Sequence, residues 1–190
     1  RYKRYILLQV LSSVVSGIMI VSGVLMFVFG NYEIAGTELA GQYDLFVSYC
    51  DKGDTVNAER LGTDLLNNSK YRSVMTDKTT AEILRYMGDC YFDEGDFANA
   101  VENYKSAYEI ADDDNAEVCL RDYAIALVKG KRFSVAQSVI SMAEEKFPNS
   151  SVNKLLQAEI EYENGNLENS LNYANECLNT ESNGDNAFAA

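Results

Sequence analysis

The chain of 190 residues contains no histidine and no tryptophan, and its one proline is Pro148. Without histidine, it lacks the usual general base for a serine or cysteine nucleophile and the imidazole ligands of most zinc and haem sites. No glycine-rich phosphate loop is present either, and no serine or cysteine has an evident neighbouring base. We therefore expect a segment that is not an enzyme and that holds no cofactor or metal.

Cysteine is also scarce, and its spacing is uninformative for metal chemistry. No two of the four cysteines form a CxxC pair; they are Cys50, Cys90, Cys119 and Cys177. A free cysteine behaves as a small hydrophobic residue and is usually buried. We expect this role for all four, with a disulfide as the alternative.

Acidic residues are absent from residues 1–30, so all 29 Asp and Glu side chains follow Phe29. The formal net charge of the chain is −13, and the part after the first segment is more negative still. The part of the chain after residue 30, which we call the acidic body, therefore repels nucleic acid and anionic lipid. We therefore expect no nucleic-acid partner.

Charge of either sign is missing from residues 5–29, YILLQVLSSVVSGIMIVSGVLMFVF. As a helix this run would be about 37 Å long, which exceeds the roughly 30 Å of a hydrocarbon layer. It is too long for the apolar stretch of a signal peptide, and no A-x-A site follows it. We expect a transmembrane helix at 5–29, followed by a linker at 30–38.

The flanks of this helix predict its orientation. Residues 1–4, RYKR, are rich in basic side chains, whereas every charged residue between the uncharged run and Lys52 is acidic. Positive residues remain on the cytoplasmic side. We expect residues 1–4 to end a cytoplasmic part that continues upstream, and the acidic body to lie outside a bacterial cell membrane. A further span upstream would reverse this topology and place the body in the cytoplasm.

Small residues recur in the apolar run at a spacing of seven. A strip of small residues allows two membrane helices to approach closely, which predicts a homodimer through this helix. Small residues are also common in membrane helices in general, which is the alternative. The repeating positions are Gln9, Ser16, Gly23 and Gly30.

Helical periodicity returns after residue 38, with no alternating strand pattern of useful length. In residues 81–114, small and aromatic residues form two helical faces around the turn DEGDF. Gly88 would allow close approach of the paired helix, with Tyr91 and Tyr104 beside it, and Gly95 suits the turn. The same spacing of small and aromatic residues recurs at intervals of 42, 36 and 35 residues, with turns at Gly53, Gly95, Gly130 and Gly165. A period near 34 predicts an array of stacked helical hairpins.

Residues 81–114 resemble a tetratricopeptide repeat, whose pattern is matched by Leu84, Met87, Gly88, Tyr91, Ala100, Tyr104 and Ala107. The family's closing proline is replaced there by Asp112 but is present in the next repeat as Pro148. The resemblance implies an all-α fold, a right-handed α-solenoid of about four hairpins, which here follows the one transmembrane helix expected from the uncharged run. We place the array at residues 39–184, with repeats at about 39–72, 81–114, 117–150 and 151–184, and with 185–190 as the start of a truncated further element.

The first repeat interval is longer because of residues 67–80, NNSKYRSVMTDKTT. Thr79 and Thr80 suggest a helix start after a short loop. Tyr71, Val74 and Met75 indicate that this loop is not wholly solvated. It could lengthen two helices or fold against the array.

The resemblance implies that the first helix of each hairpin lines a concave groove for an extended peptide or a partner's helix. Transferred by position, the groove residues are Tyr43, Val47, Arg85, Asp89, Phe92, Arg121, Ile125 and Val128. Two arginines among aromatic residues would suit a segment with apolar anchors and a carboxylate. In the simpler alternative, Arg85 and Arg121 only pair with neighbouring acids.

The resulting hypothesis is a membrane-anchored scaffold or adaptor that binds protein segments in its groove. The alternative function is the extracytoplasmic sensor part of a bacterial membrane Ser/Thr protein kinase whose catalytic domain lies upstream. This alternative rests on architectural analogy. A catalytic loop of HRD type followed by DFG in the upstream coding sequence would favour it.

Overall fold

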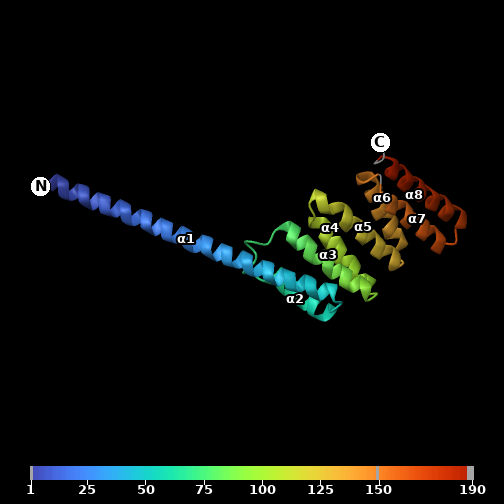
Figure 1. The fold of residues 1–190 in the computed structure, drawn as a ribbon, viewed down its shortest axis with the longest axis horizontal. Coiled ribbons are helices and arrows are strands. Elements are labelled where there is room, and N and C mark those ends of the chain that lie inside the picture. Colours follow the sequence, from blue (N-terminus) through green and yellow to red (C-terminus); the bar gives the residue numbers. More distant parts are fainter. Residues whose placement is uncertain (1, 149, 188–190) are drawn as a thin grey trace.

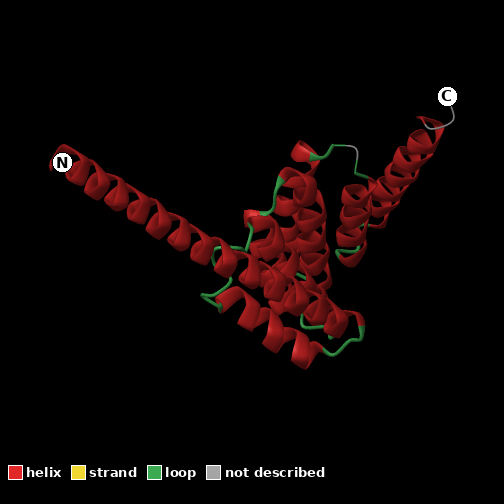
Figure 2. Ribbon diagram, turned by 60° about the vertical axis from the view of Figure 1, so that its left-hand side comes forward, coloured by secondary structure: helices red, strands yellow, loops and turns green. Residues whose placement is uncertain are grey.

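The computed structural model describes residues 2–148 and 150–187, with side chains over 18–148 and 150–179. Helices and short connections make up all of these residues (Figures 1 and 2). The all-α prediction is confirmed. The helices are α1 (Tyr2–Asp51), α2 (Thr55–Asn67), α3 (Asp77–Asp93), α4 (Phe97–Ile110), α5 (Asp113–Lys129), α6 (Phe133–Lys146), α7 (Ser151–Glu163) and α8 (Leu167–Ala187).

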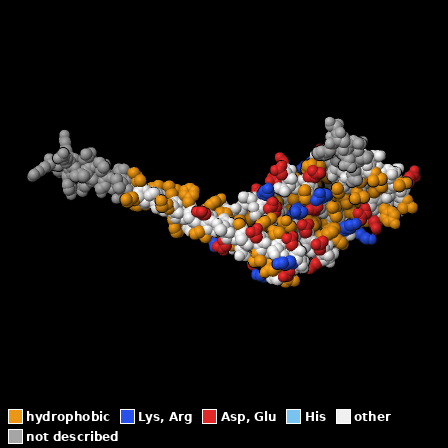
Figure 3. Space-filling model, viewed as in Figure 1, with side chains coloured by type: hydrophobic (Ala, Val, Ile, Leu, Met, Phe, Trp, Pro, Cys, Tyr) orange, Lys and Arg blue, Asp and Glu red, His pale blue; other side chains and the backbone are white. Residues whose placement is uncertain are grey.

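Helix α1 has two parts with different surroundings. Its N-terminal half projects away from the other helices (Figure 1). The apolar side chains of this half that the structure describes, from residue 18 onward, are uncovered (Figure 3), with Phe27 70% exposed. From Ala35 onward it is packed against the array, with Leu39 and Phe46 buried. By length and composition, one helix in the described part of the chain could cross a membrane, and this is α1 from Ile18 to Asp51.

Residues 30–38, expected as a linker, are helical and belong to α1. The reason is that Ala35, Leu39 and Phe46 occupy one helical face and are buried together, so the helix continues through this region. Of the positions in the expected strip of small residues, Gln9 and Ser16 lie outside the described side chains. Residue 1 of the expected cytoplasmic end and residues 188–190 of the expected further element lie outside the described residues.

The turns within the hairpins lie where the glycines predict them. Gly53, Gly95 and Gly165 have φ values of 67°, 80° and 80°, a conformation that side chains with a Cβ resist. The third hairpin differs, because Gly130 has an ordinary φ and Lys131 takes the positive value of 57°. The position of this turn was therefore predicted correctly, but not the residue with the left-handed conformation.

Helix α3 begins earlier than expected. Its N-cap is Thr76, whose hydroxyl oxygen accepts a hydrogen bond from the Thr79 amide at 3.1 Å. Thr79 and Thr80 therefore lie within the first helical turn rather than before it. The threonine pair indicated a helix start, but the capping side chain is the one that precedes Asp77.

The core consists of two clusters. One is formed by α1, α2 and α3 around Phe46, Leu65 and Ile83. The other extends from α4 to α7 around Leu120, Leu127 and Ile140. Helices α3 and α4 join the clusters at Gly88, where a Cβ would lie 2.7 Å from the Tyr104 ring. This confirms the predicted role of Gly88 as a site of close helix approach.

The odd-numbered helices form the inside of a curved stack. Helix α1 contacts α3, α3 contacts α5, and α5 contacts α7, with Cα atoms within 8 Å. No two even-numbered helices approach so closely within the described residues. A row of helices that are close on one side and separated on the other bends toward the close side. The stack is therefore a helical-repeat solenoid with the odd-numbered helices on its concave face.

The four cysteines, all within the described side chains, form no disulfide with one another. Cys90, Cys119 and Cys177 are buried, which confirms the expectation of small buried hydrophobic residues, while Cys50 is half-buried. The Cys50 and Cys90 thiols share a hydrogen bond between α1 and α3, and this bond raises the pKa of Cys50.

Candidate protein-binding surface

The concave face carries a continuous row of polar and aromatic side chains, which we call the inner wall. Helix α1 contributes the start of the row, α3 its centre and α5 its far end. The members that are half-buried and interact with one another or with the core beside them are Tyr43, Glu82, Arg85, Tyr86, Asp89, Phe92, Arg121, Asp122 and Ile125.

An ion cluster lies at the centre of the inner wall. Arg85 Nη1 is 3.3 Å from Asp122 Oδ2 on α5 and 3.7 Å from Asp89 Oδ2 one turn along α3. Arg121 Nη2 lies 3.2 Å from Asp122 Oδ1. Both arginines therefore pair with acids of the wall itself, which was the simpler of the two alternatives for them.

Asp89 connects this cluster to the helix behind the wall. Its Oδ1 accepts a hydrogen bond of 2.7 Å from the Tyr104 hydroxyl, which comes from α4 behind the wall. Burial raises the pKa of Asp89, against the opposing effects of Tyr104 and Arg85. Burial and the bond to Asp89 likewise raise the pKa of Tyr104. Asp89 thus serves the packing of the second hairpin as well as the wall.

Tyr43 connects α1 to the same surface. Its hydroxyl donates a hydrogen bond of 3.1 Å to Glu82 Oε2 on α3. Burial raises the pKa of Tyr43, and the neighbouring charge of Glu82 adds to this effect. Val47, one helical turn later, is half-buried against the first core cluster.

Of the four predicted apolar groove residues, Val47, Phe92 and Ile125 remain partly accessible. Phe92 and Ile125 are half-buried at the edge of the second core cluster, and the Phe92 ring meets Phe97 edge-on at 5.3 Å. Val128 is only 3% exposed and contributes to the core instead. It was expected on the wall, but its position near the end of α5 turns it toward the neighbouring helices.

Three inner-wall residues were missed by the sequence analysis, namely Glu82, Tyr86 and Asp122. The Arg85 guanidinium lies over the Tyr86 ring at 5.3 Å, Glu82 receives the Tyr43 hydroxyl, and Asp122 binds both arginines. The repeat period offers a signal for Asp122. It lies 37 residues after Arg85, about one period, so stacking places the two at nearly the same level of adjacent helices.

A hollow of about 430 Å³ adjoins the inner wall where α1 and α3 end. It is lined by Tyr86 and Asp89 together with the further acids Asp51, Asp93 and Glu94. With Glu82 and Asp122 counted, carboxylates outnumber the two guanidinium groups along this surface. The concave face is therefore acidic despite its arginines.

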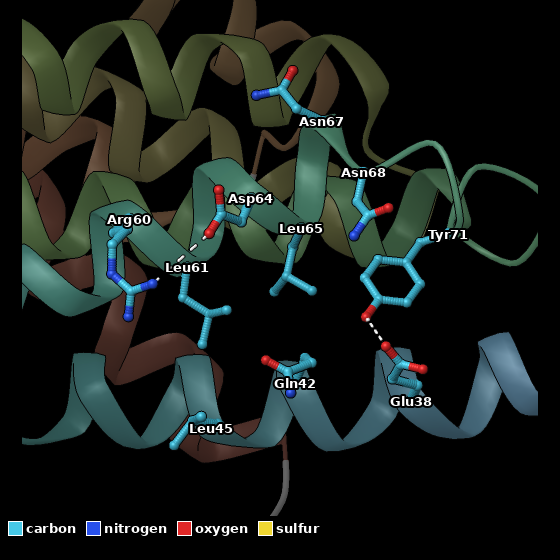
Figure 4. A pocket seen from close by; sticks show the side chains of 10 residues that line it. All are labelled: Glu38, Gln42, Leu45, Arg60, Leu61, Asp64, Leu65, Asn67, Asn68 and Tyr71. Atoms are coloured by element: carbon cyan, nitrogen blue, oxygen red, sulfur yellow. Dashed lines mark hydrogen bonds and ion pairs between the residues drawn. The ribbon is translucent and has the colours of Figure 1, made fainter.

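A second hollow, of about 560 Å³, lies between α1 and α2 at the N-terminal end of the stack (Figure 4). The side chains of Glu38, Gln42 and Leu45 face those of Leu61 and Tyr71 across it. None of the predicted groove residues lines it. Over the described residues, no three Cys, Asp or Glu side chains are grouped so as to hold a metal ion.

One comparison with known proteins agrees with this architecture. A family model described as "Tetratricopeptide repeat" matches residues 91–160, from the end of α3 to α7. The resemblance to this family is therefore confirmed over that segment. No curated protein matches the chain. Repeats of this kind support a role in protein–protein interaction.

Proposed function

Starting from this tetratricopeptide segment, we propose that the chain is a membrane-anchored scaffold whose inner wall binds a segment of a partner protein. Helix α1 anchors the array through residues 5–29. The array itself lies on the extracytoplasmic side of the membrane.

The contact pattern of the helices carries this proposal. Each odd-numbered helix contacts the next odd-numbered helix, whereas no two even-numbered helices do so within the described residues. The exposed side chains of the odd-numbered helices therefore form one uninterrupted concave surface. An extended segment or a helix can therefore contact several hairpins at once. Such a surface buries more of a ligand than a convex face does.

The charges of the inner wall define the partner's chemistry. Arg85 and Arg121 are engaged by Asp122, so they are not available as carboxylate receptors. Phe92 and Ile125 offer apolar contact, and the adjoining hollow contributes Asp93 and Glu94. We expect a partner segment with apolar anchors and basic or neutral polar groups.

A photo-cross-linking experiment tests the wall directly. We expect benzoylphenylalanine at position 92, on the inner wall, to capture a defined partner protein in cells that produce the chain. The matched control places the same group at Val135 on α6, an even-numbered helix, and should give no such adduct. Equal capture at both positions would contradict a concave binding face.

A charge reversal tests the proposed chemistry of the partner. Asp93→Lys should reduce the adduct formed at position 92 at least several-fold, because the hollow loses a carboxylate and gains a cation. Asp114→Lys, an equal change on the exposed start of α5, should leave the adduct unchanged. An undiminished adduct in the Asp93 variant would rule out an acidic recognition surface.

The membrane orientation has an independent test. Protease added to intact spheroplasts should digest the array if it lies outside the membrane, and should digest it only after lysis if it lies in the cytoplasm. Digestion only after lysis would reverse the proposed topology but would leave the binding surface intact.

A further inference from the structure

The connection between α2 and α3, residues 68–76, differs from the other connections of the array. It is the longest of them, and it is ordered by its own hydrogen bonds, including those from the Val74 and Met75 amides to the Tyr71 carbonyl at 2.9 and 2.7 Å. The Tyr71 side chain is 4% exposed and belongs to the first core cluster. The connection therefore has a defined position rather than extending freely into solvent.

Helix α1 holds this connection in place. The Tyr71 hydroxyl donates a hydrogen bond of 3.0 Å to Glu38 Oε1, as Figure 4 shows. The Lys70 ammonium forms an ion pair with the other oxygen of the same carboxylate. Because both contacts go to α1, the connection folds against the long helix and does not lengthen α2 or α3.

The connection also reaches the end of the apolar run. Lys70 and Ser73 line one hollow together with Val28, Asn31 and Tyr32 of α1. Val28 is the second-last residue of the uncharged run that ends at Phe29. In Figure 1 the α2–α3 connection is the part of the array that lies nearest to the N-terminal half of α1.

The height of this hollow above the hydrocarbon layer follows from helix geometry. At about 1.5 Å per residue, Asn31 lies about 3 Å and Ala35 about 9 Å beyond Phe29 along α1. The headgroup region adds roughly 5 to 8 Å on each side of the hydrocarbon core. Ser73, which lines the hollow with Asn31 and Tyr32, is therefore at the level of the lipid headgroups, and Arg72 is the residue before it.

We propose that the α2–α3 connection is a membrane-surface contact, in which Arg72 binds a lipid phosphate group beside the point where α1 leaves the bilayer. This inference rests on the proposed transmembrane role of α1. Tyr32, which is exposed at the same level, adds an aromatic ring of the kind enriched at membrane interfaces.

The local charge is compatible with this contact although the body as a whole is acidic. Glu38 is neutralised by Lys70, and Arg72 is exposed, with no acid paired to it in the described part of the chain. A guanidinium group can bind a phosphate through two parallel hydrogen bonds. Since the rest of the array repels an anionic surface, the contact is confined to this connection and sets the orientation of the first hairpin relative to the membrane.

The absence of tryptophan allows a fluorescence test on the full chain. Single tryptophans are introduced as Ser73→Trp in the connection, Ile18→Trp near the middle of the apolar run, and Ser138→Trp on exposed α6. Each variant is reconstituted in vesicles of phosphatidylethanolamine and phosphatidylglycerol (3:1) that carry bromine either near the headgroup or deep in the acyl chain. We expect shallow bromine to quench Ser73→Trp most, deep bromine to quench Ile18→Trp most, and neither to quench Ser138→Trp.

A second variant distinguishes phosphate binding by the Arg72 cation from insertion of the new tryptophan ring at position 73, because tryptophan itself favours membrane interfaces. Arg72→Glu should at least halve the quenching of Ser73→Trp, whereas Arg132→Glu, a change on the exposed α5–α6 turn, should leave it unchanged. Quenching that does not respond to Arg72→Glu would overturn the phosphate contact.

The outcomes also distinguish this inference from the proposed function. If Ile18→Trp is quenched but Ser73→Trp is quenched no more than Ser138→Trp, the surface contact is wrong and the transmembrane helix stands. If Ile18→Trp is not quenched by deep bromine, the membrane anchor fails, and the surface contact fails with it.

Discussion

The second and fourth hairpins have the same design but different surroundings. Val101 on α4 is 1% exposed, whereas Leu171, at the equivalent position 70 residues later on α8, is 63% exposed. Helix α5 packs against α4, but no described helix covers that face of α8. The difference shows that burial in this array depends on the neighbouring hairpin, because one hairpin cannot bury its own outer face.

The largest expected effect comes from a pair of leucine-to-alanine substitutions that test this comparison. Leu127→Ala in α5 removes a fully buried side chain of the second core cluster and should lower the free energy of unfolding by about 3 kcal/mol. Leu171→Ala should change it by less than about 0.5 kcal/mol, because water already surrounds that side chain. Urea unfolding followed by circular dichroism of the full chain in detergent measures both. Similar losses would mean that α8 is covered in solution.

A glycine pair tests how closely α3 and α4 must approach. Gly88→Ala should cost about 2 kcal/mol, since the added Cβ would lie 2.7 Å from the Tyr104 ring. Gly41→Ala, in an open part of α1, should instead stabilise the chain by about 0.5 kcal/mol through its helix preference. The same unfolding experiment measures both changes. A neutral Gly88→Ala variant would show that the two core clusters are not rigidly joined there.

The buried tyrosine of the central hairpin predicts a pH dependence. The pKa of Tyr104 is raised above its ordinary value of 10.0, mainly by burial. The folded chain therefore holds this proton more tightly than the unfolded chain does. The resulting stability is fully present below pH 10 and is lost as the pH rises above it, by up to about 1.4 kcal/mol per pH unit.

Unfolding measurements between pH 8 and 11 check this prediction. The variant Tyr104→Phe should have a shallower loss of stability above pH 10 than the parent chain. Tyr162→Phe, on the exposed side of α7, should leave the slope as it is. An unchanged slope in Tyr104→Phe would mean that its hydroxyl ionises without disturbing the fold.

The smallest expected effect concerns the polar contacts of the last hairpin. Lys154 Nζ lies 2.8 Å from Glu144 Oε1 on α6 and 3.5 Å from Glu176 Oε2 on α8. Lys154→Met should cost about 0.5 kcal/mol, because these ion pairs are partly exposed to water. Amide hydrogen exchange should become faster in α8 but not in α4. Lys105→Met, which affects a pair within α4, serves as the control; faster exchange throughout the array would argue against a local role.

Sequence reasoning located the helices and turns because their signals are local. Helical spacing relates residues three and four apart, and Gly53, Gly95 and Gly165 mark turns through their own backbone freedom. The close approach at Gly88 was also predictable, since a glycine within a helical pattern needs a packing reason. The groove was predicted only through positions, which is why Val128 was assigned to the wall although it is buried.

The sequence by itself determined an uncharged helical run followed by four acidic helical hairpins, since periodicity and charge are properties of neighbouring residues. Only the tertiary structure decided that Arg85 and Arg121 are paired with Asp122, and that Lys70 and Tyr71 bind Glu38. The physical reason is distance. Hydrogen bonds and ion pairs form within about 4 Å, and the order of residues along the chain does not say which atoms of different helices come that close.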